Sequence, residues 1–412
     1  MSWKFWQKKV QSSVNEVVIR AKKLYTPLGI NPKRGREMAN LFVKEDVYIH
    51  IVNDRIVDIS HSRPDFNGIY LYGDLVIPGL IDCHTHIPFY GYRESDFLRR
   101  SSGLSYLQIH NSGGGIYESV SKLRSASFDD LVRFNLKLIN RLFRKGVTTL
   151  EGKTGYGLDT ENELKQLKVL EVLNKLSPAE IIPTFMGAHS VPKEKDQDSY
   201  VNDLISMLDL IKNRCTFVDI FCDEGAFDVD HASKYLMAAK ERGYKVRVHA
   251  DEIKNTQATK LAVKLGAISA EHLIKIDEDS IKSISQSNTI AVLLPATSFY
   301  INESYAPARK LIDSNAIVSL ASDFNPGSSA VIEPSFVMNI SVKNLKMTPQ
   351  EILTAFTLNA ACVLSLSDRL GSVEIGKQAD LLIYNDADLE TITYLIGIQP
   401  DYVIKRGEIF EN

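Results

Sequence analysis

The chain has 412 residues and a formal net charge of −3, with 44% hydrophobic and 24% charged residues. This composition is typical of a globular protein long enough for one large domain and a smaller one. The sequence contains no basic stripe interleaved with aromatic residues and no apolar run of the ~18 residues that a membrane span needs. We therefore expect neither nucleic acid nor a membrane as a partner.

The beginning of the chain, MSWKFWQKKVQSS, is locally basic but lacks the apolar core and cleavage site of a signal peptide. We predict a short polar arm that leads into a strand at Glu16–Arg20. The four cysteines show no CxxC pairing, and three of them lie in apolar segments. Cysteines of this kind are typical of core residues in a reducing compartment, so we expect a cytoplasmic protein.

Short apolar or β-branched runs alternate with longer segments of helical period through the middle of the chain. The eight predicted strands are Gly79–His84, Val147–Lys153, Ile181–His189, Phe217–Asp223, Lys245–Ala250, Ala267–His272, Thr289–Pro295 and Ile317–Asp323. A helix is predicted after Ser127, where SFDD resembles a capping box. Further predicted helices are Glu161–Leu176, Ala232–Arg242, Thr256–Leu265 and Ser280–Ser285. Eight alternating units predict an α/β fold, a parallel (β/α)8 TIM barrel.

The two ends of the chain have a different pattern from the middle. Residues 14–77 and 371–410 contain short strand-like runs, and VNDRI and KRGEI are typical of hairpins. We expect these distant segments to pair as a small composite β-sandwich domain made of residues 1–77 and 366–412. The barrel domain is then predicted to span residues 78–365.

Polar residues gather where the predicted strands end, and the active site of a parallel barrel lies at that end. Five of the nine histidines occupy such positions, namely His84, His86, His189, His249 and His272. On a strand, His84 and His86 point to the same side because they are two residues apart. Together with His249 and Asp323 they predict a metal site, and such ligands suit zinc, iron or manganese.

This ligand set leaves room for a water molecule. A bound metal lowers the pKa of such a water from about 15.7 towards about 7, which gives hydroxide at neutral pH. Asp323 could hold the proton of that water, and His272 and Glu252 are candidate acid–base groups because they would lie near it. The alternative for Glu252 is a charged residue at a helix start, where the helix dipole stabilises it.

The stretch PGLIDCHTH, with two downstream histidines and a strand-end aspartate, resembles the amidohydrolase superfamily. The GYR, SGGGI and KTGYGLD stretches resemble the imidazolonepropionase family more specifically, over roughly residues 76–365. The resemblance implies a (β/α)8 barrel with a composite β-sandwich, and one divalent or trivalent ion, zinc or iron, per chain. It also implies hydrolysis of the ring C–N bond of 4-imidazolone-5-propanoate to N-formimino-L-glutamate, in histidine degradation, by a homodimer that uses a metal-bound hydroxide.

The resemblance further implies roles for individual residues. The metal ligands would be His84, His86, His249 and Asp323. The substrate would be bound by Arg93, Tyr156, His189, Glu252, Asn325, Gly327 and Ser328, and the catalytic groups would be Glu252, His272 and Asp323. Arg93 would hold the propionate, since a guanidinium matches a carboxylate in two parallel hydrogen bonds.

Several alternatives stay open at this point. Arg93 could form a surface ion pair with neighbouring acidic residues, and Tyr156 could simply fill a turn. The family usually has Gly-Gly before the Arg motif, where this chain has Tyr90-Gly91-Tyr92, and this departure could reshape the carboxylate pocket. Lys153 invites comparison with the carbamylated lysine of two-metal relatives, but that lysine lies on the fourth strand. Here the fourth run ends in acidic residues, so one metal is favoured.

Two rival functions fit the same residues. Another cyclic-amide hydrolase, or a deaminase, would use the same metal site, but only a substrate with a carboxylate needs Arg93. A non-catalytic binding protein on the same barrel is the alternative from another class. The presence of all four predicted ligands argues against it.

Overall fold

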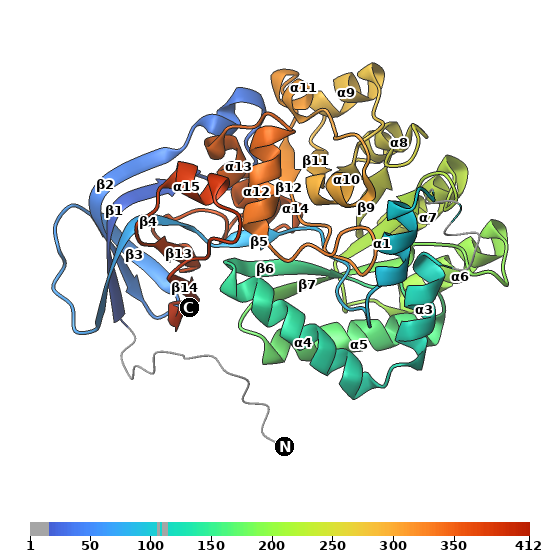
Figure 1. Cartoon of the computed structure of the whole chain (residues 1–412), viewed down its shortest axis with the longest axis horizontal. Helices are drawn as coiled ribbons and strands as arrows, with labels where there is room; N and C mark the ends of the chain where they lie inside the picture. Colours follow the sequence, from blue (N-terminus) through green and yellow to red (C-terminus); the bar gives the residue numbers. More distant parts are fainter. Residues whose placement is uncertain (1–15, 105–107, 109–113) are drawn as a thin grey trace.

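The structure, a computed structural model, describes residues 16–104, 108 and 114–412. Eight parallel strands pair in chain order in one sheet (Figure 1). They are β5 (Leu80–Asp82), β6 (Val147–Lys153), β7 (Glu180–Ala188), β8 (Phe217–Cys222), β9 (Lys245–Ala250), β10 (Ser269–His272), β11 (Ile290–Leu293) and β12 (Val318–Leu320). Just beyond β5 and β12, the N–H of Asp323 donates to the carbonyl of His84 at 3.0 Å, and the N–H of His86 donates to Phe324 at 2.9 Å. These bonds nearly close the sheet into a barrel.

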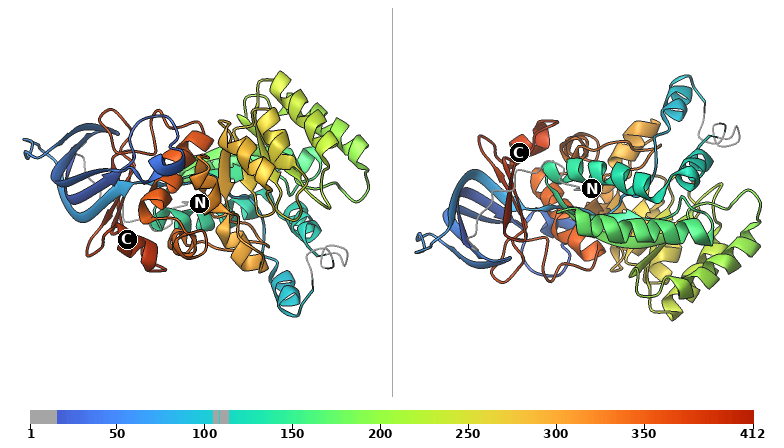
Figure 2. Two further views of the ribbon diagram at one scale, coloured as in Figure 1. Left: turned by 90° about the horizontal axis from the view of Figure 1, so that it is seen from above. Right: turned by 90° about the horizontal axis from the view of Figure 1, so that it is seen from below.

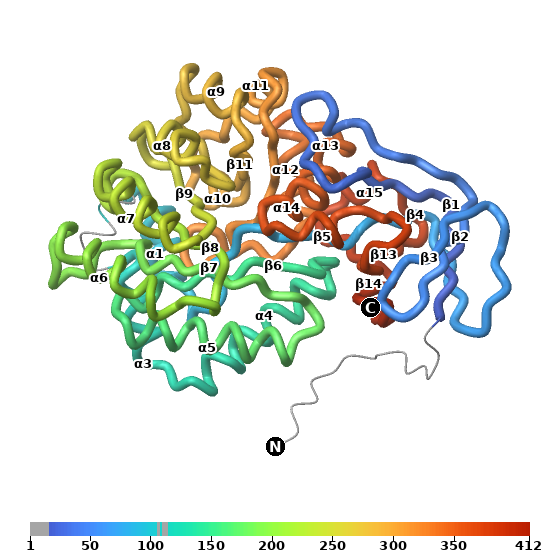
Figure 3. Tube along the Cα trace, turned by 180° about the vertical axis from the view of Figure 1, so that it is seen from behind, coloured from blue at the N-terminus to red at the C-terminus, as the bar shows by residue number. Residues whose placement is uncertain are grey.

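Helices surround the barrel, and most of them lie against its outside (Figure 3), whereas α1 projects away from it (Figure 2). They are α1 (Glu94–Ser101), α3 (Ile116–Ser125), α4 (Phe128–Arg144), α5 (Thr160–Leu176), α6 (Gln197–Leu210), α7 (Val229–Glu241), α8 (Ala258–Lys264), α9 (Glu278–Ser285), α10 (Pro295–Ile301), α11 (Ala308–Asp313), α12 (Pro334–Lys343), α13 (Pro349–Phe356), α14 (Leu358–Val363) and α15 (Leu389–Tyr394). The Ser127 hydroxyl caps α4 by accepting from the N–H of Asp130 at 3.1 Å. The same hydroxyl donates to the Asp130 carboxylate at 2.7 Å. The N-terminal cap of α4 is therefore formed by the Ser127 side chain.

Strands from both ends of the chain form a second sheet, seen beside the barrel in Figure 2. Its order is β15-β14-β13-β4-β1-β2-β3. The strands are β1 (Glu16–Thr26), β2 (Phe42–Val52), β3 (Arg55–Ser60), β4 (Ile69–Pro78), β13 (Leu381–Tyr384), β14 (Tyr402–Lys405) and β15 (Glu408–Glu411), and a short 3-10 helix spans Gly35–Ala39. Antiparallel pairing of Leu382 with Ile77 joins the two ends of the chain. Buried apolar residues from both halves of the sheet form one cluster, as in a sandwich.

A cluster of charges at the base of the barrel, opposite the strand ends that carry the histidines, connects the two sheets. We call it the base cluster, and its members are Glu180, Arg369, Asp380, Lys405 and Arg406. Glu180 begins β7, and its Oε2 lies 3.0 Å from Arg369 Nη1 and 3.2 Å from Arg406 Nη2. Lys405 Nζ lies 2.6 Å from Asp380 Oδ2 and 3.3 Å from the hydroxyl of Thr149 in β6. These contacts fix the terminal sheet to the barrel.

The predicted fold class is confirmed, since all eight predicted strands pair in parallel and the terminal strands form a common sheet. The hairpins predicted at VNDRI and KRGEI join β2 to β3 and β14 to β15. The predicted strand at Glu16–Arg20 is the first half of β1, whereas the basic arm before it lies outside the described residues. The domain boundaries stay a prediction. Among the helices of the described residues, none has the length and apolarity that crossing a membrane requires.

Candidate metal-dependent active site

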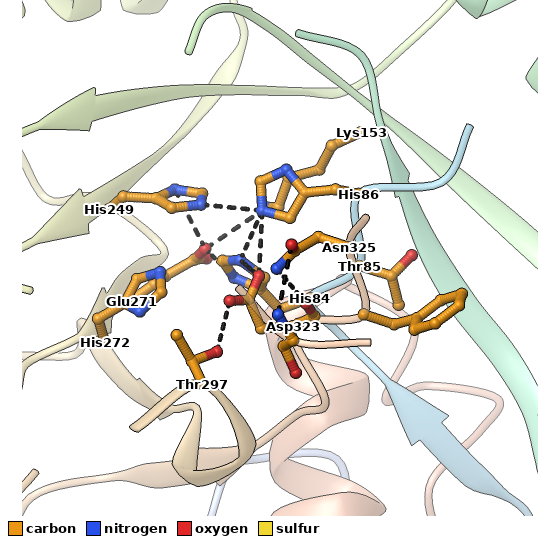
Figure 4. A network of polar contacts seen from close by, with 12 residues as sticks. His84, Thr85, His86, Lys153, His249, Glu271, His272, Thr297, Asp323 and Asn325 are labelled. Carbon is orange, nitrogen blue, oxygen red and sulfur yellow. Dashed lines mark hydrogen bonds and ion pairs between the residues drawn. The ribbon is translucent and has the colours of Figure 1, made fainter. Parts of the chain in front are cut away.

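The four predicted metal ligands point toward one another at the carboxyl ends of the barrel strands (Figure 4). Nε2 of His86 lies 3.3 Å from Nε2 of His84 and 3.3 Å from Nε2 of His249. Oδ1 of Asp323 lies 3.3 Å from Nε2 of His84 and 3.2 Å from Nε2 of His86. Donors about 2.0–2.1 Å from a tetrahedral ion lie about 3.3 Å from one another, so these separations fit one small metal ion.

The chemistry of the donors fits a metal ion as well. Oδ1 of Asp323 is buried and has no hydrogen-bond partner among the described residues, while Thr297 donates to its Oδ2 at 2.5 Å. Burial lowers the pKa of His86 to about 3, so its imidazole is in the neutral form that binds metals. Burial would raise the pKa of Asp323, but the imidazoles of His84 and His86 beside Oδ1 hold it well below its usual value, so the carboxylate is ionised. The donors are therefore three imidazoles around one carboxylate, a set that suits a small metal ion.

Carboxylates hold the far side of two of these histidines. Nδ1 of His249 lies 3.1 Å from Asp219, whose carboxylate accepts a hydrogen bond from it and leaves Nε2 to bind a metal. Glu271 contacts Nδ1 of His84 in the same way. Burial and the Lys153 ammonium would lower the pKa of His84, but the acidic neighbours raise it to about 9. The site therefore attracts positive charge, and a proton competes with a metal at His84.

The carboxylates belong to a fully buried ionic layer inside the barrel, below the metal ligands. We call it the mouth cluster, and its members are Glu151, Lys153, Asp219, Arg247 and Glu271. Arg247 donates to Glu271 at 2.7 Å and to the carbonyl of Cys83 at 2.7 Å, and it also contacts Glu151. Asp219 and Arg247 were not singled out from the sequence. Their signal was a charged residue in the middle of an apolar strand, FVDIFC and KVRVHA, which requires a buried partner.

A cavity of about 100 Å³ opens above the metal ligands. It is lined by six of the predicted substrate-binding residues, namely Arg93, Tyr156, His189, Glu252, Asn325 and Ser328, and by His272. The seventh, Gly327, does not line this cavity but lies against the guanidinium of Arg93. A Cβ atom at Gly327 would lie 1.7 Å from Arg93 Nη2, so only glycine leaves room for the arginine here.

Arg93 is buried, with 6% of its surface exposed, so its ion pair with a neighbouring acidic residue is formed in the interior and not at the surface. Its Nη1 donates to the hydroxyl of Ser119 at 3.2 Å, and its Nε lies 3.2 Å from Asp96. Its backbone N–H donates to the carbonyl of Pro326 at 2.9 Å. These contacts hold a guanidinium at the wall of the cavity.

Two buried side chains of α5 shape the loop that presents Tyr156. The Glu163 carboxylate accepts from the N–H groups of Gly155 at 3.0 Å, Gly157 at 2.8 Å and Leu158 at 2.9 Å. Gln166 accepts from the N–H of Tyr156 at 3.1 Å. Tyr156 therefore fills a tightly bonded turn and also lines the cavity, so both interpretations of this residue hold.

His189 stacks on His86, with ring centroids 4.9 Å apart. Burial lowers its pKa well below the usual value, and the nearby His86, His249 and Arg93 add to this effect. Its Nδ1 lies 3.2 Å from the carbonyl of Gly155. A carbonyl only accepts, so Nδ1 carries the proton and Nε2 is left as an acceptor.

Glu252 and His272 face each other, with Oε2 and Nε2 3.6 Å apart. Burial raises the pKa of Glu252 well above its usual value, and the charges of Asp323 and Asp223 raise it further. Burial likewise lowers the pKa of His272 well below its usual value. Glu252 precedes α8, which begins at Ala258, so the helix-start interpretation does not apply. Both shifts favour the uncharged forms, a carboxylic acid beside a neutral imidazole.

In the loop after β12, the Asn325 side chain forms hydrogen bonds with the backbone of its own loop. Its Oδ1 accepts from the N–H groups of Gly327 at 2.8 Å and Ser328 at 2.7 Å, and its Nδ2 donates to the carbonyl of Asp323 at 2.7 Å. His272 has φ +75° and Asp323 has φ +53°, a backbone region that costs energy for residues other than glycine. Asn325 therefore fixes the loop that carries a metal ligand in a strained conformation.

The two tyrosines that depart from the family pattern turn away from the cavity. Tyr90 and Tyr92 pack against Phe134, with ring centroids 5.4 Å and 5.8 Å apart. Neither lines the cavity above the metal ligands. Part of the family-specific SGGGI stretch, including Gly113, lies outside the described residues, whereas Gly115 donates its N–H to Asp96 at 2.9 Å.

Known proteins resemble this chain over most of its length. Residues 75–410 match the amidohydrolase family. The chain is 41% identical to an imidazolonepropionase from Kosmotoga olearia over 96% of this chain and 98% of that protein. It is 42% identical to an imidazolonepropionase from Fusobacterium nucleatum over 91% and 94% of the two chains.

Solved structures share the fold at low identity. A guanine deaminase from C. acetobutylicum superposes with a TM-score of 0.72 at 16% identity, over 96% of this chain and 100% of that one. A zinc-bound adenosine deaminase from Xanthomonas campestris superposes with a TM-score of 0.69 at 17% identity, over 95% and 92% of the two chains. The family match and the relatives above 40% identity together define the family. The chain belongs to the amidohydrolase family and, within it, to the imidazolonepropionases.

Proposed function

We propose that the chain hydrolyses the ring C–N bond of 4-imidazolone-5-propanoate and releases N-formimino-L-glutamate. The observation that carries this proposal is a buried guanidinium, that of Arg93, in the wall of the cavity above four converging metal-ligand donors. The donors serve hydrolysis of many cyclic amides. The guanidinium selects a substrate with a carboxylate, because it offers two parallel N–H groups to the two carboxylate oxygens.

We propose one divalent ion, zinc or ferrous iron, held by His84, His86, His249 and Asp323. When bound, such an ion supplies a Lewis acid that activates water at neutral pH. The charge of the interior supports a divalent ion. Asp323 and the mouth cluster together contain four carboxylates and two cations, which leaves two negative charges uncompensated when His84 is neutral, as a metal ligand must be. A dication neutralises them, and buried charges are stable only when compensated.

The remaining polar groups of the cavity are proposed to orient the substrate ring. Arg93 holds the propionate, while Tyr156 and His189 contact the ring on the side of the metal ligands. His189 presents Nε2 as an acceptor, so it pairs with a ring N–H rather than with a carbonyl. Ser328 and the loop that Asn325 fixes close the end of the cavity beside Arg93. Gly327 contributes by leaving space for Arg93.

Two residues are proposed to transfer protons, and a third is proposed to stabilise the developing negative charge. Asp323 is ionised and takes a proton from the attacking water. His272 is neutral and donates a hydrogen bond to the ring carbonyl oxygen as negative charge develops there, which stabilises the transition state. The raised pKa of Glu252 favours its protonated form, and this residue gives its proton to the ring nitrogen as the C–N bond breaks. Water is added across that bond, and the formimino product leaves.

The rival functions differ in how they depend on Arg93. A deaminase or a hydrolase of a neutral ring has no carboxylate for this residue to bind. We expect Arg93→Met to raise KM for imidazolonepropionate by about 10- to 100-fold, since hydrogen bonds between charged groups contribute about 1.5–3 kcal/mol. The kcat is expected to change less. A neutral ring substrate turned over equally by the wild type and by Arg93→Met would favour the rival enzymes.

The decisive experiment is incubation of the purified, metal-loaded protein with freshly generated imidazolonepropionate. We expect the absorbance of the substrate to fall and formiminoglutamate to accumulate in equal amount. Metal analysis of the same sample separates the alternatives. A sample with one ion per chain and no loss of absorbance would contradict the substrate, whereas a sample that retains no metal would favour a non-catalytic binding protein. The homodimer and the cytoplasmic location stay predictions.

A further inference from the structure

Lys153 is a fully buried lysine that the proposed reaction does not use. Its Nζ lies 2.7 Å from Oε2 of Glu151, 2.7 Å from Oδ2 of Asp219 and 3.4 Å from Oε2 of Glu271. These three carboxylates come from three different strands, β6, β8 and β10, and all are fully buried. The ammonium is thus a compact cation in a cage of carboxylate oxygens.

The cage is connected directly to the proposed metal ligands. Asp219 accepts from Nδ1 of His249 at 3.1 Å, and Glu271 contacts Nδ1 of His84 and lies 3.7 Å from Nδ1 of His249. Outer partners of this kind fix the orientation of a ligating imidazole, and their loss costs about 10- to 100-fold in metal affinity. Lys153 contacts both carboxylates, so it orients both histidines through them.

The cage also has the composition of a cation site. The ligand atoms of Asp219, His249 and Glu271 lie within 4.8 Å of one another, which is close enough for one ion to bridge them. Carboxylate oxygens are ligands for hard divalent ions. The second oxygen of Glu151 and the ammonium of Lys153 occupy the same region, only 2.7 Å apart. A metal ion could not enter this cage without displacing the ammonium.

We infer that Lys153 is a positioning residue that serves as a built-in cation: it holds Asp219 and Glu271 against the ligand histidines and fills the place of a second metal ion. The inference rests on the proposed metal site at His84, His86, His249 and Asp323. The inference explains why Lys153, the last residue of β6, lies beside a centre that binds one metal ion and not two. In this inference Lys153 acts as an unmodified ammonium that is paired with carboxylates, and not as a carbamylated ligand that bridges two metal ions.

The test compares Lys153→Ala with the wild type and with Lys405→Ala. Lys405 is the matched control, because it is another buried lysine among carboxylates, but in the base cluster. Full-length proteins are stripped with a chelator, titrated with Co²⁺ alone and desalted. Native mass spectrometry then counts the bound ions, and visible absorption reports their coordination.

We expect one Co²⁺ per chain with the same spectrum in the wild type and in Lys405→Ala. We expect two Co²⁺ per chain and an altered spectrum in Lys153→Ala, because the cage then has room and excess negative charge. One ion with the wild-type spectrum in Lys153→Ala would overturn the inference. One ion with an altered spectrum would support the positioning role and overturn the exclusion of a second ion.

The wild type alone also tests the inference, which matters if Lys153→Ala does not fold. A wild-type chain that retains a second Co²⁺ after desalting would overturn the built-in cation. A wild-type chain that takes up no Co²⁺ would instead overturn the proposed metal centre itself. The two failures are therefore distinguishable.

Discussion

The barrel contains two clusters of charges, one at each end, and they differ in balance and in connections. The mouth cluster is fully buried, has three carboxylates against two cations, and contacts two of the proposed metal ligands. The base cluster has two carboxylates against three cations, and its Arg406 side chain is 54% exposed. It joins the terminal sheet to the barrel.

The comparison indicates that similar ion pairs serve different purposes in one fold. Buried ion pairs contribute little net stability compared with apolar packing, because desolvation costs about as much as the pairing returns. The mouth cluster is therefore best explained by the orientation of histidines and by its excess negative charge, which a metal ion compensates. The base cluster is best explained by the docking of two sheets. Substitutions in the two clusters should then affect different measurements.

The largest difference is expected between Asp323→Ala, in the centre above the mouth cluster, and Asp380→Ala, in the base cluster. Asp323→Ala removes a proposed metal ligand. Loss of a residue that only orients a ligand costs up to about 100-fold in activity, so we expect turnover of Asp323→Ala to fall by more than that. Asp380→Ala should lower thermal stability and leave kcat within about 3-fold, since it lies far from the reacting atoms. Bound metal and turnover, measured on the same samples, test this. Equal turnover in both variants would contradict the claim that the metal centre serves catalysis while the base cluster serves only stability.

The next largest effect is expected on stability. Arg247→Met leaves Glu151 and Glu271 without their main cation, and removing one partner of a buried pair costs about 3–5 kcal/mol. Arg406→Met removes a half-exposed partner of Glu180, so we expect about 1 kcal/mol or less. Urea unfolding of the metal-free proteins measures both free energies. Similar losses of unfolding free energy in the two variants would show that the ion pairs of the two clusters do not differ in strength because of burial.

A smaller and pH-dependent effect is expected for Glu180→Gln in the base cluster. Burial would raise the pKa of Glu180, but Arg369, Lys405 and Arg406 lower it from 4.5 to about 2. The ionised carboxylate therefore stabilises the fold above pH 4.5, and this stabilisation is lost as the pH falls from 4.5 towards 2. The shift corresponds to about 3 kcal/mol at neutral pH.

Unfolding of the wild type and Glu180→Gln at pH 7 and at decreasing pH, again without metal, measures this contribution. The difference in unfolding free energy should narrow steadily below pH 4.5, while turnover at pH 7 stays close to that of the wild type. A difference that is independent of pH would mean that the packing of Glu180, and not its charge, stabilises the base cluster.

The sequence predicted the strands and the residues at their ends well, because alternation and strand length are local properties. His84 and His86 follow β5, which ends at Asp82, and their two-residue spacing still brings both imidazoles to one side. The mouth cluster could not be predicted in the same way. Arg247 meets Glu151 and Glu271 only once the barrel closes, and these partners lie 96 and 24 residues away.

The supporting roles of Gly327, Glu163 and Gln166 also could not be predicted from the sequence. Gly327 matched a family position for substrate binding, yet its lack of a side chain is what seats Arg93. Glu163 and Gln166 are ordinary helix residues in sequence, and their bonds to the Tyr156 loop depend on how α5 packs against the barrel. Such roles follow from tertiary distances, which periodicity does not encode.

The most direct test of the central claim is an anomalous difference map, recorded from crystals of the metal-loaded protein at the absorption edge of the bound ion. The account predicts one peak per chain, about 2.0–2.2 Å from Nε2 of His84, His86 and His249 and from a carboxylate oxygen of Asp323. A peak that leaves out any of these four side chains, or a second peak in the cage around Lys153, would contradict it.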